Sequence, residues 1–341
     1  MRIGILTGGG DAPGLNAAIR AVVQRAEAAA ADVSGIANGW AGAMKGDARP
    51  LTATDVYDIL PMGGTILGTS RTNPLKVEGG VDTVRRMLRA SDIDALVAIG
   101  GDDTLSVARA LHEAGVSVVG VPKTIDNDLC ATEFCIGFDT AVGIVAEAVD
   151  RLHTTASAHH RVMVLEVMGR DTGWVATLGG LAGGADVVLI PEVPVALDEV
   201  LEHFRWRHAH GRDFSIVVVA EGVWDSTLGT VAAATTDAFG NERLASRGVG
   251  DALSRYIERE TGFESRVTVL GHLQRGGSAS TVDRIWATRL GVRAAELAVD
   301  GTSGVVVVRR GDDVTIAPIA DVIAERRRVP IELYALTRMF G

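Results

Sequence analysis

The sequence predicts an α/β protein with mostly parallel sheets and two domains. Short, nearly continuous runs of Val, Ile and Leu alternate with alanine-rich segments of helical periodicity. Such runs are typical of strands buried on both faces, as in parallel sheets covered by helices. The chain has 341 residues, of which 47% are hydrophobic and 22% charged, so it is long enough to bury more than one core.

The predicted elements alternate along the whole chain. Strands are expected at 3–6, 93–99, 116–121, 162–167, 187–190, 215–220 and 305–308. Helices are expected at 15–31, 81–90, 104–114 and 140–156. Asp139 precedes the last of these helices and is predicted to cap its amino terminus. No repeat or long Gly/Ser linker marks a domain boundary.

Composition excludes several classes of partner. There are 33 Lys and Arg residues against 43 Asp and Glu, a net charge of −10, which disfavours nucleic acids and anionic membranes. Cys130 and Cys135 match neither a zinc pattern nor a disulfide framework and are expected to be reduced thiols. The amino terminus enters a strand without a signal-type segment, and no apolar run could span a membrane. We therefore expect a cytoplasmic protein.

The first motif is a run of glycines, Gly8 to Gly10, between the first strand and the first helix. Consecutive glycines let backbone N–H groups approach an anion, and the following helix amino terminus favours negative charge. A tight turn without a ligand would explain the same residues. The Rossmann spacing is absent, which argues against a dinucleotide.

The second motif, residues 100–104, again places glycines between a strand and a helix and adds Asp102 and Asp103. A capping role explains one aspartate at a helix amino terminus but explains two poorly. Asp102 is predicted to bind Mg²⁺, because this cation prefers carboxylate oxygen and bridges phosphate oxygens.

The third motif, residues 122–128, follows another strand. If the segment is extended, Thr124, Asp126 and Asp128 project to one side. A solvated turn with local hydrogen bonds is the alternative. In the functional interpretation a carboxylate accepts the proton of an attacking hydroxyl, and Lys123 stabilises phosphate charge.

These three motifs, in this order, resemble the phosphofructokinase family. Four more segments are similar to family signatures: residues 63–71, 161–170, 220–222 and 270–277. The resemblance extends through nearly the whole chain. It implies two similar three-layer αβα domains: a donor domain formed by 1–138 and 274–325, and a fructose 6-phosphate domain formed by 139–273 and 326–341.

The resemblance also implies roles for individual residues. Asp126 would be the general base for the sugar 1-hydroxyl, Thr124 would hold that hydroxyl, and Arg170 would stabilise the transferred phosphoryl group. The diphosphate would be bound by Gly10, Gly101, Asp103, Thr104 and Lys123. The sugar would be lined by Met168, Gly169, Glu221, His272, Leu273, Gln274 and Arg275.

Two further arginines, Arg161 and Arg266, would reach the 6-phosphate from a neighbouring subunit. The resemblance therefore implies a homo-oligomer, either a dimer or a tetramer, with shared active sites.

The phosphoryl donor is predicted from Asp103. ATP-dependent members resembling this sequence usually have glycine there, which leaves room for the α-phosphate of the nucleotide. Two like charges about 4 Å apart repel by roughly 4 kcal/mol at an effective dielectric of 20, so Asp103 should exclude ATP and admit pyrophosphate. Lys123, which stands where many ATP-dependent members have glycine, supports pyrophosphate less strongly. The implied reaction is a reversible, Mg²⁺-dependent transfer to fructose 6-phosphate in glycolysis and gluconeogenesis.

Alternatives remain open from the sequence alone. An ATP-dependent phosphofructokinase needs Asp103 to turn aside. Lipid and NAD kinases share a similar glycine turn, but their other signatures are missing. The alternative outside the enzymes is a non-catalytic sensor that binds a sugar phosphate. His203, His208 and His210 are expected on a solvated helix face. The run Arg326 to Arg328 is expected to be a surface or interface charge cluster outside the site.

Overall fold

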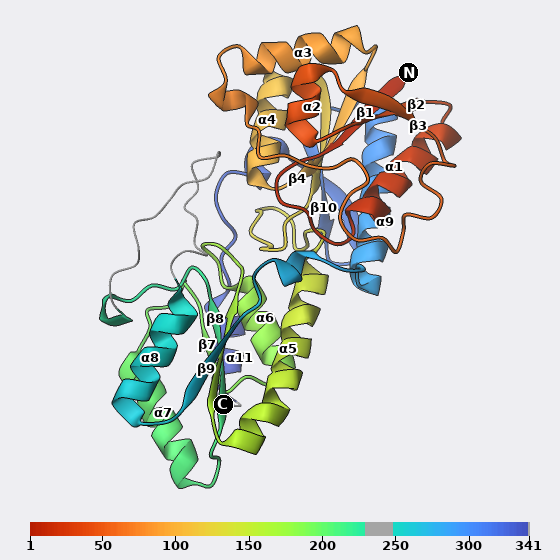
Figure 1. The fold of residues 1–341 in the computed structure, drawn as a ribbon. Helices are drawn as coiled ribbons and strands as arrows, with labels where there is room; N and C mark the ends of the chain where they lie inside the picture. The colour runs from red at the N-terminus through yellow and green to blue at the C-terminus, as the bar shows by residue number, and fades with distance from the viewer. Residues whose placement is uncertain (229–247, 340–341) are drawn as a thin grey trace. The chain divides into compact units, whose positions relative to one another are not determined.

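The computed structural model describes residues 1–228 and 248–339. The chain forms two compact units (Figure 1). Unit 1 consists of Met1–Thr140 and Arg275–Arg326, and unit 2 of Ala141–Gln274 and Arg327–Gly341. The predicted domain limits fall within two residues of these limits. Which ligand each unit binds stays a prediction.

Unit 1 is built on a seven-stranded sheet with the order β11-β10-β5-β4-β1-β2-β3. Its strands are β1 (Arg2–Thr7), β2 (Asp32–Ile36), β3 (Ala48–Leu51), β4 (Ala95–Gly100), β5 (Ser117–Pro122), β10 (Val305–Arg310) and β11 (Asp313–Pro318). Its helices are α1 (Leu15–Ala28), α2 (Gly39–Lys45), α3 (Gly80–Ala90), α4 (Asp102–Glu113), α9 (Thr281–Val299) and α10 (Ile319–Val322). The pairs β2–β3 and β10–β11 are antiparallel, and the other neighbours are parallel.

Both faces of this sheet are covered by helices, so unit 1 has three layers. On one face, Ile5 and Val97 of the sheet share a core with Ile19 of α1 and Leu290 of α9. On the other face, residues of the same strands form a second core with α2, α3 and α4. The alternation of side chains along each strand explains why the buried strands read as continuous apolar runs.

Unit 2 has a four-stranded, entirely parallel sheet with the order β7-β8-β6-β9. Its strands are β6 (Val162–Val167), β7 (Val187–Leu189), β8 (Ser215–Ala220) and β9 (Ser265–Val269). Its helices are α5 (Phe138–His159), α6 (Trp174–Gly183), α7 (Leu197–Ala209), α8 (Val249–Thr261) and α11 (Ile331–Thr337). Helices α5 and α6 lie on one face and α7 and α8 on the other (Figure 1). The predicted α/β class with mostly parallel sheets is confirmed.

Several short edge strands were not predicted. β3 contains Arg49 and Pro50, and Pro50 pairs with Ser34 of β2 at the margin of the sheet. Proline is tolerated there because an edge strand has one side without a ladder to complete. None of the helices in residues 1–228 and 248–339 is long and apolar enough to cross a lipid bilayer.

The predicted cap of α5 is wrong. The helix begins at Phe138, so Asp139 lies inside the first turn, where its carboxylate accepts a hydrogen bond from the Ser280 hydroxyl. The orphan amide of Thr140 is satisfied instead by Asp283 of α9, at 2.8 Å, and Asp283 also accepts from the amide of Gly137 at 2.7 Å. A buried carboxylate from a distant helix thus fixes the start of α5.

Candidate active site

The three motifs meet at the carboxyl ends of three central strands in the sheet of unit 1. β1, β4 and β5 are parallel neighbours, with Thr7 opposite Ile99 and Gly100 opposite Pro122. Because their carboxyl ends lie side by side, the segments that follow them converge. This is where open α/β sheets place their ligands.

Lys123 organises the first glycine turn. Its side chain is buried, with 3% exposed, and its Nζ donates to the carbonyls of Gly8 at 2.8 Å and Gly10 at 2.5 Å. A trans peptide holds each carbonyl opposite the next N–H, so the amides of Gly9 and Asp11 point away from the lysine. Two of three ammonium hydrogens are used, which leaves one for another acceptor.

Burial also changes the charge state of this lysine. The pKa of Lys123 is lowered to about 7, first by desolvation and then by the positive charge of Arg275. The carboxylates of Asp11, Asp126 and Asp102 oppose the shift. A lysine that titrates near neutrality in a polar cluster is typical of a functional site.

The glycines around α4 have two different physical roles. Thr104 is buried, and a Cβ on Gly8 or Gly100 would come within 2.4 Å of its Oγ1, so these positions are glycine for packing. A Cβ on Gly101 would meet nothing closer than 3.5 Å. A Cβ at Gly101 would therefore make only ordinary contacts, and Asp102 and Asp103 begin α4 directly after it.

The third motif is a turn, so the extended conformation considered for residues 124–128 is wrong. The amide of Asp126 donates to Thr124 Oγ1 at 3.1 Å, and Asn127 has a left-handed φ of 51°. Asn127 Oδ1 accepts from the Cys135 amide at 3.0 Å, which fixes the turn. Asp126 and Asp128 are nonetheless both buried, and the Thr124 hydroxyl orients the backbone of Asp126.

Asp128 in this turn is affected by two other carboxylates, Asp126 of the same turn and Asp102 at the start of α4. Burial, followed by the charges of Asp126 and Asp102, raises the pKa of Asp128 to about 7. The charge of Arg326 acts in the opposite direction, and its Nη2 lies 4.0 Å from Asp102 Oδ2. The expectation that Arg326 is a surface charge away from the site is therefore wrong. Asp128 was visible in the motif, whereas nothing local in the sequence connects Arg326 to it.

Arg275 also belongs to this half of the site. Its Nη1 donates to the carbonyl of Asp11 at 3.1 Å, and a Cβ on Gly10 would lie 2.5 Å from the same nitrogen. The guanidinium therefore contacts the first glycine turn, within unit 1.

In unit 2, the turn after β6 carries Met168, Gly169 and Arg170. Arg170 has a left-handed φ of 51°, which is strained for a residue with a side chain. Its amide donates to Glu221 Oε1 at 3.3 Å. A Cβ on Gly222 would lie 1.9 Å from the Arg170 carbonyl, so only glycine permits this turn.

The predicted sugar residues at 272–274 have unequal environments. Gln274 is fully buried, and its side chain accepts from the Met168 amide at 3.3 Å and donates to the Gly271 carbonyl at 3.1 Å. His272 and Leu273 are exposed, Leu273 by 69%. Gln274 thus supports the Met168 turn, while His272 and Leu273 are accessible to a ligand.

Arg161 and Arg266 lie at the other end of the same sheet. Arg161 precedes β6, and Arg266 lies in β9 opposite Met163. Both form ion pairs with Glu264, Arg161 at 2.9 Å. The strand between Arg161 and Met168 spans about 20 Å. These arginines therefore cannot join the Met168–Arg170 turn of their own chain in one small site.

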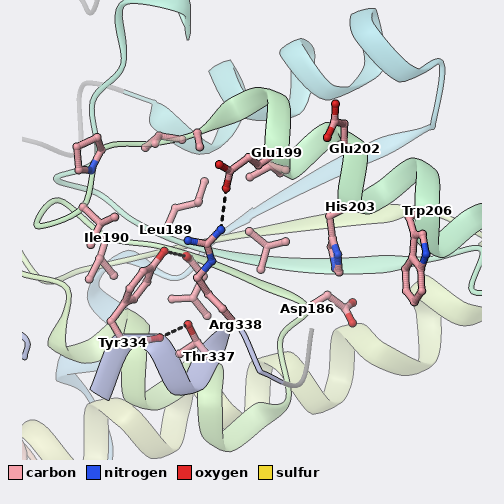
Figure 2. Close-up of a pocket in the computed structure, with 17 residues that line it drawn as sticks. Asp186, Leu189, Ile190, Glu199, Glu202, His203, Trp206, Tyr334, Thr337 and Arg338 are labelled. Carbon is pink, nitrogen blue, oxygen red and sulfur yellow. Dashed lines mark hydrogen bonds and ion pairs between the residues drawn. The ribbon is translucent and has the colours of Figure 1, made fainter. Parts of the chain in front are cut away.

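Unit 2 also contains a cavity of about 420 Å³ beside the edge strand β7 (Figure 2). Its polar lining includes Asp186, Glu199, Glu202 and His203. Two of these acids are neutralised by ion pairs, Glu199 with Arg338 of the same lining and Asp186 with Arg207, both at 2.7 Å. His203 is half-buried in this lining, whereas His208 and His210 are exposed as expected. No cluster of three potential His, Cys, Asp or Glu metal ligands occurs in the described part of the chain.

Comparisons with known proteins identify relatives over the full length. Residues 2–298 match the family described as Phosphofructokinase. The chain is 51% identical to the pyrophosphate–fructose 6-phosphate 1-phosphotransferase of Amycolatopsis mediterranei, covering 100% of this chain and 99% of that protein. It is 45% identical to ATP-dependent 6-phosphofructokinase 2 of Streptomyces coelicolor, covering 97% of each.

Among solved structures, the chain is similar to phosphofructokinase from Pichia pastoris, with a TM-score of 0.83 and 32% identity. The match covers 95% of this chain and 35% of that one, so this chain spans about a third of the larger protein.

Substitution by alanine should affect thermal stability differently at the two kinds of glycine position. Gly8→Ala should lower the thermal unfolding midpoint by roughly 2–10 °C, because its Cβ overlaps Thr104. Gly101→Ala should leave the midpoint within about 2 °C of the unmodified protein, because its Cβ makes only ordinary contacts. Thermal scans of the two variants in parallel test this. Equal losses would show that Gly101 is also glycine for packing.

Proposed function

Because the chain belongs to the phosphofructokinase family, we propose that it transfers a phosphoryl group reversibly from pyrophosphate to the 1-hydroxyl of fructose 6-phosphate. The products are fructose 1,6-bisphosphate and phosphate, and the enzyme acts in glycolysis and gluconeogenesis. The relatives reported above include both a pyrophosphate-dependent and an ATP-dependent enzyme. The cytoplasmic location stays a prediction.

The observation that carries the donor assignment is Asp103 in the first turn of α4. It follows Asp102, which comes directly after Gly101, where the chain has room for a Cβ. A second carboxylate there adds bulk and negative charge on the side where a nucleotide would continue beyond its two outer phosphates. Pyrophosphate ends after two phosphates and avoids this repulsion.

Asp102 and its neighbours fit a bound Mg²⁺. The ion usually takes one or two protein carboxylates and completes its shell with substrate phosphates and water. A cluster in which Asp102 and Asp126 raise the pKa of Asp128 has the excess negative charge that such an ion neutralises. Asp102 would hold the Mg²⁺, which would supply charge neutralisation at the phosphates.

In this proposal the protein residues bind and orient the reactants and move one proton. Asp126 accepts the proton of the sugar 1-hydroxyl, which Thr124 helps to hold. The oxygen attacks the nearer phosphorus, and phosphate leaves with the electrons of the broken P–O bond. Lys123 and Arg170 stabilise charge on the phosphoryl oxygens. Gly10, Gly101 and Thr104 complete the diphosphate site.

The sugar is bound by Met168, Gly169 and Glu221 with residues 272–275. The 6-phosphate is bound by Arg161 and Arg266 of a neighbouring subunit, so the active enzyme is a homo-oligomer. Supporting this, both arginines lie at the end of the sheet away from the Met168 turn of their own chain. Glu264 holds them together as one cationic pair.

Fructose 1,6-bisphosphate formation with separate donors tests the function. We expect turnover with pyrophosphate and Mg²⁺ and none with ATP. Asp103→Gly should raise kcat/KM for ATP by roughly tenfold or more, because it removes a like charge and a side chain. It should lower kcat/KM for pyrophosphate, because it removes the group that stands in for the missing α-phosphate.

Asp82→Gly is the matched control, since Asp82 also lies in the first helical turn of its element, α3. Its donor preference should not change. Turnover of the unmodified enzyme with ATP alone would contradict the donor assignment. Sugar binding without turnover of any donor would support a sensor.

The lowered pKa of Lys123 predicts that activity with pyrophosphate declines at alkaline pH. Because this group loses its proton above about pH 7 in the free enzyme, kcat/KM for pyrophosphate should fall as pH rises through that value. Lys123→Met should have low activity and lack this limb between pH 6 and about 9. A pH profile of both enzymes measures it. The same limb in Lys123→Met would assign the titration to another group.

Shared active sites predict complementation between inactive variants. Asp126→Ser should lower kcat by roughly 10²–10⁴ through loss of the base, and Arg161→Ala should abolish productive sugar binding. In a mixed dimer one site carries both changes and the other carries neither. Co-expression should therefore recover about a quarter of the unmodified activity. No recovery, with hybrids demonstrated by two affinity tags, would show that Arg161 does not act across subunits.

A further inference from the structure

A short segment near the carboxyl end of unit 1 is attached to the acidic turn. The amide of Cys130 donates to the Val322 carbonyl at 3.0 Å, and its Sγ lies 3.3 Å from the Glu325 carbonyl. Leu129 and Arg326 form an antiparallel bridge. The backbone of Arg326 is therefore held directly beside the residues that follow Asp128.

The next residue is fixed as well. The Arg327 guanidinium lies 4.2 Å from the centre of the Trp174 ring, and its carbonyl accepts from Trp174 Nε1 at 2.8 Å. The bridge to Leu129 holds the backbone of Arg326. Its side chain is one-third exposed, and Nη2 lies 4.0 Å from Asp102 Oδ2.

This arrangement puts a partly exposed cation beside the predicted metal ligand. The carboxylates of Asp102, Asp126 and Asp128 repel one another, and an arginine beside them offsets part of that repulsion. A divalent cation that arrives at Asp102 competes with the guanidinium for the same oxygen. An anionic donor that arrives with the cation gives the displaced guanidinium a new partner, because guanidinium binds phosphate oxygens well.

We propose that Arg326 is a positioning residue of the donor site, which neutralises Asp102 when the site is empty and turns to the donor phosphates when a metal binds. It thereby disfavours the metal alone and favours the metal–diphosphate complex. The inference rests on the proposed function only for the identity of the donor.

The experiment measures metal and donor separately in the full-length protein. Mn²⁺ binding without donor is followed by electron paramagnetic resonance, and KM for pyrophosphate by steady-state turnover. In Arg326→Gln, the Kd for Mn²⁺ should fall roughly 3- to 10-fold, since a competing, partly exposed charge is lost. KM for pyrophosphate should rise roughly tenfold. Shifts in opposite directions would not follow from a structural defect.

Two further variants sharpen the result. Arg326→Lys keeps the charge, so Mn²⁺ affinity should stay within about twofold of the unmodified protein while KM takes an intermediate value. Arg328→Gln removes an exposed member of the same arginine run and should change neither quantity. Thermal unfolding of each variant verifies the fold.

Unchanged values in Arg326→Gln, or weakening of both metal and donor, would overturn the proposal. The Mn²⁺ measurement does not depend on the donor. If the unmodified enzyme used only ATP, the proposed function would fail, and the metal result together with KM for ATP would still decide the role of Arg326.

Discussion

The buried ammonium of Lys123 is the interaction on which the rest of the donor half depends. It lies between the ends of β1 and β5 and holds the carbonyls of Gly8 and Gly10. Without it, two carbonyls would lose partners inside the protein, which costs about 1–3 kcal/mol for each group. The same contact turns the amides of the glycine turn outward. A single residue thus closes the turn and gives it the polarity that an anion needs.

A balance of charge surrounds this lysine. Arg275 pushes its pKa down, and the carboxylates of Asp11, Asp126 and Asp102 push it up. Arg326 performs a similar task for the acidic turn. Each arginine is close to a point where the chain leaves unit 1, since Arg275 begins the second segment of that unit and Arg326 ends it. The two arginines that act on these turns thus lie where the chain passes from one unit to the other.

Much of this organisation was predictable because it depends on local sequence. The alternating pattern gave the sheet class, and the motifs at 8–10, 100–104 and 122–128 follow strands whose ends meet. Contacts between distant segments were not predictable. Asp283, and not Asp139, satisfies the start of α5, and Arg326 approaches Asp102 only because Val322 is attached to Cys130. Periodicity and spacing carry no information about such pairings.

Family membership alone does not determine which phosphoryl donor an enzyme uses. Identities of 51% to a pyrophosphate-dependent enzyme and 45% to an ATP-dependent one mean that most of the fold serves either donor. In the proposed site, the carboxyl ends of the strands and the lysine-bound turn would accept a phosphate whatever is attached to it. Discrimination must then arise where the two donors differ, which is beyond the second phosphate. A charge there acts on one donor and hardly on the other, so one side chain in the first turn of α4 can decide between them.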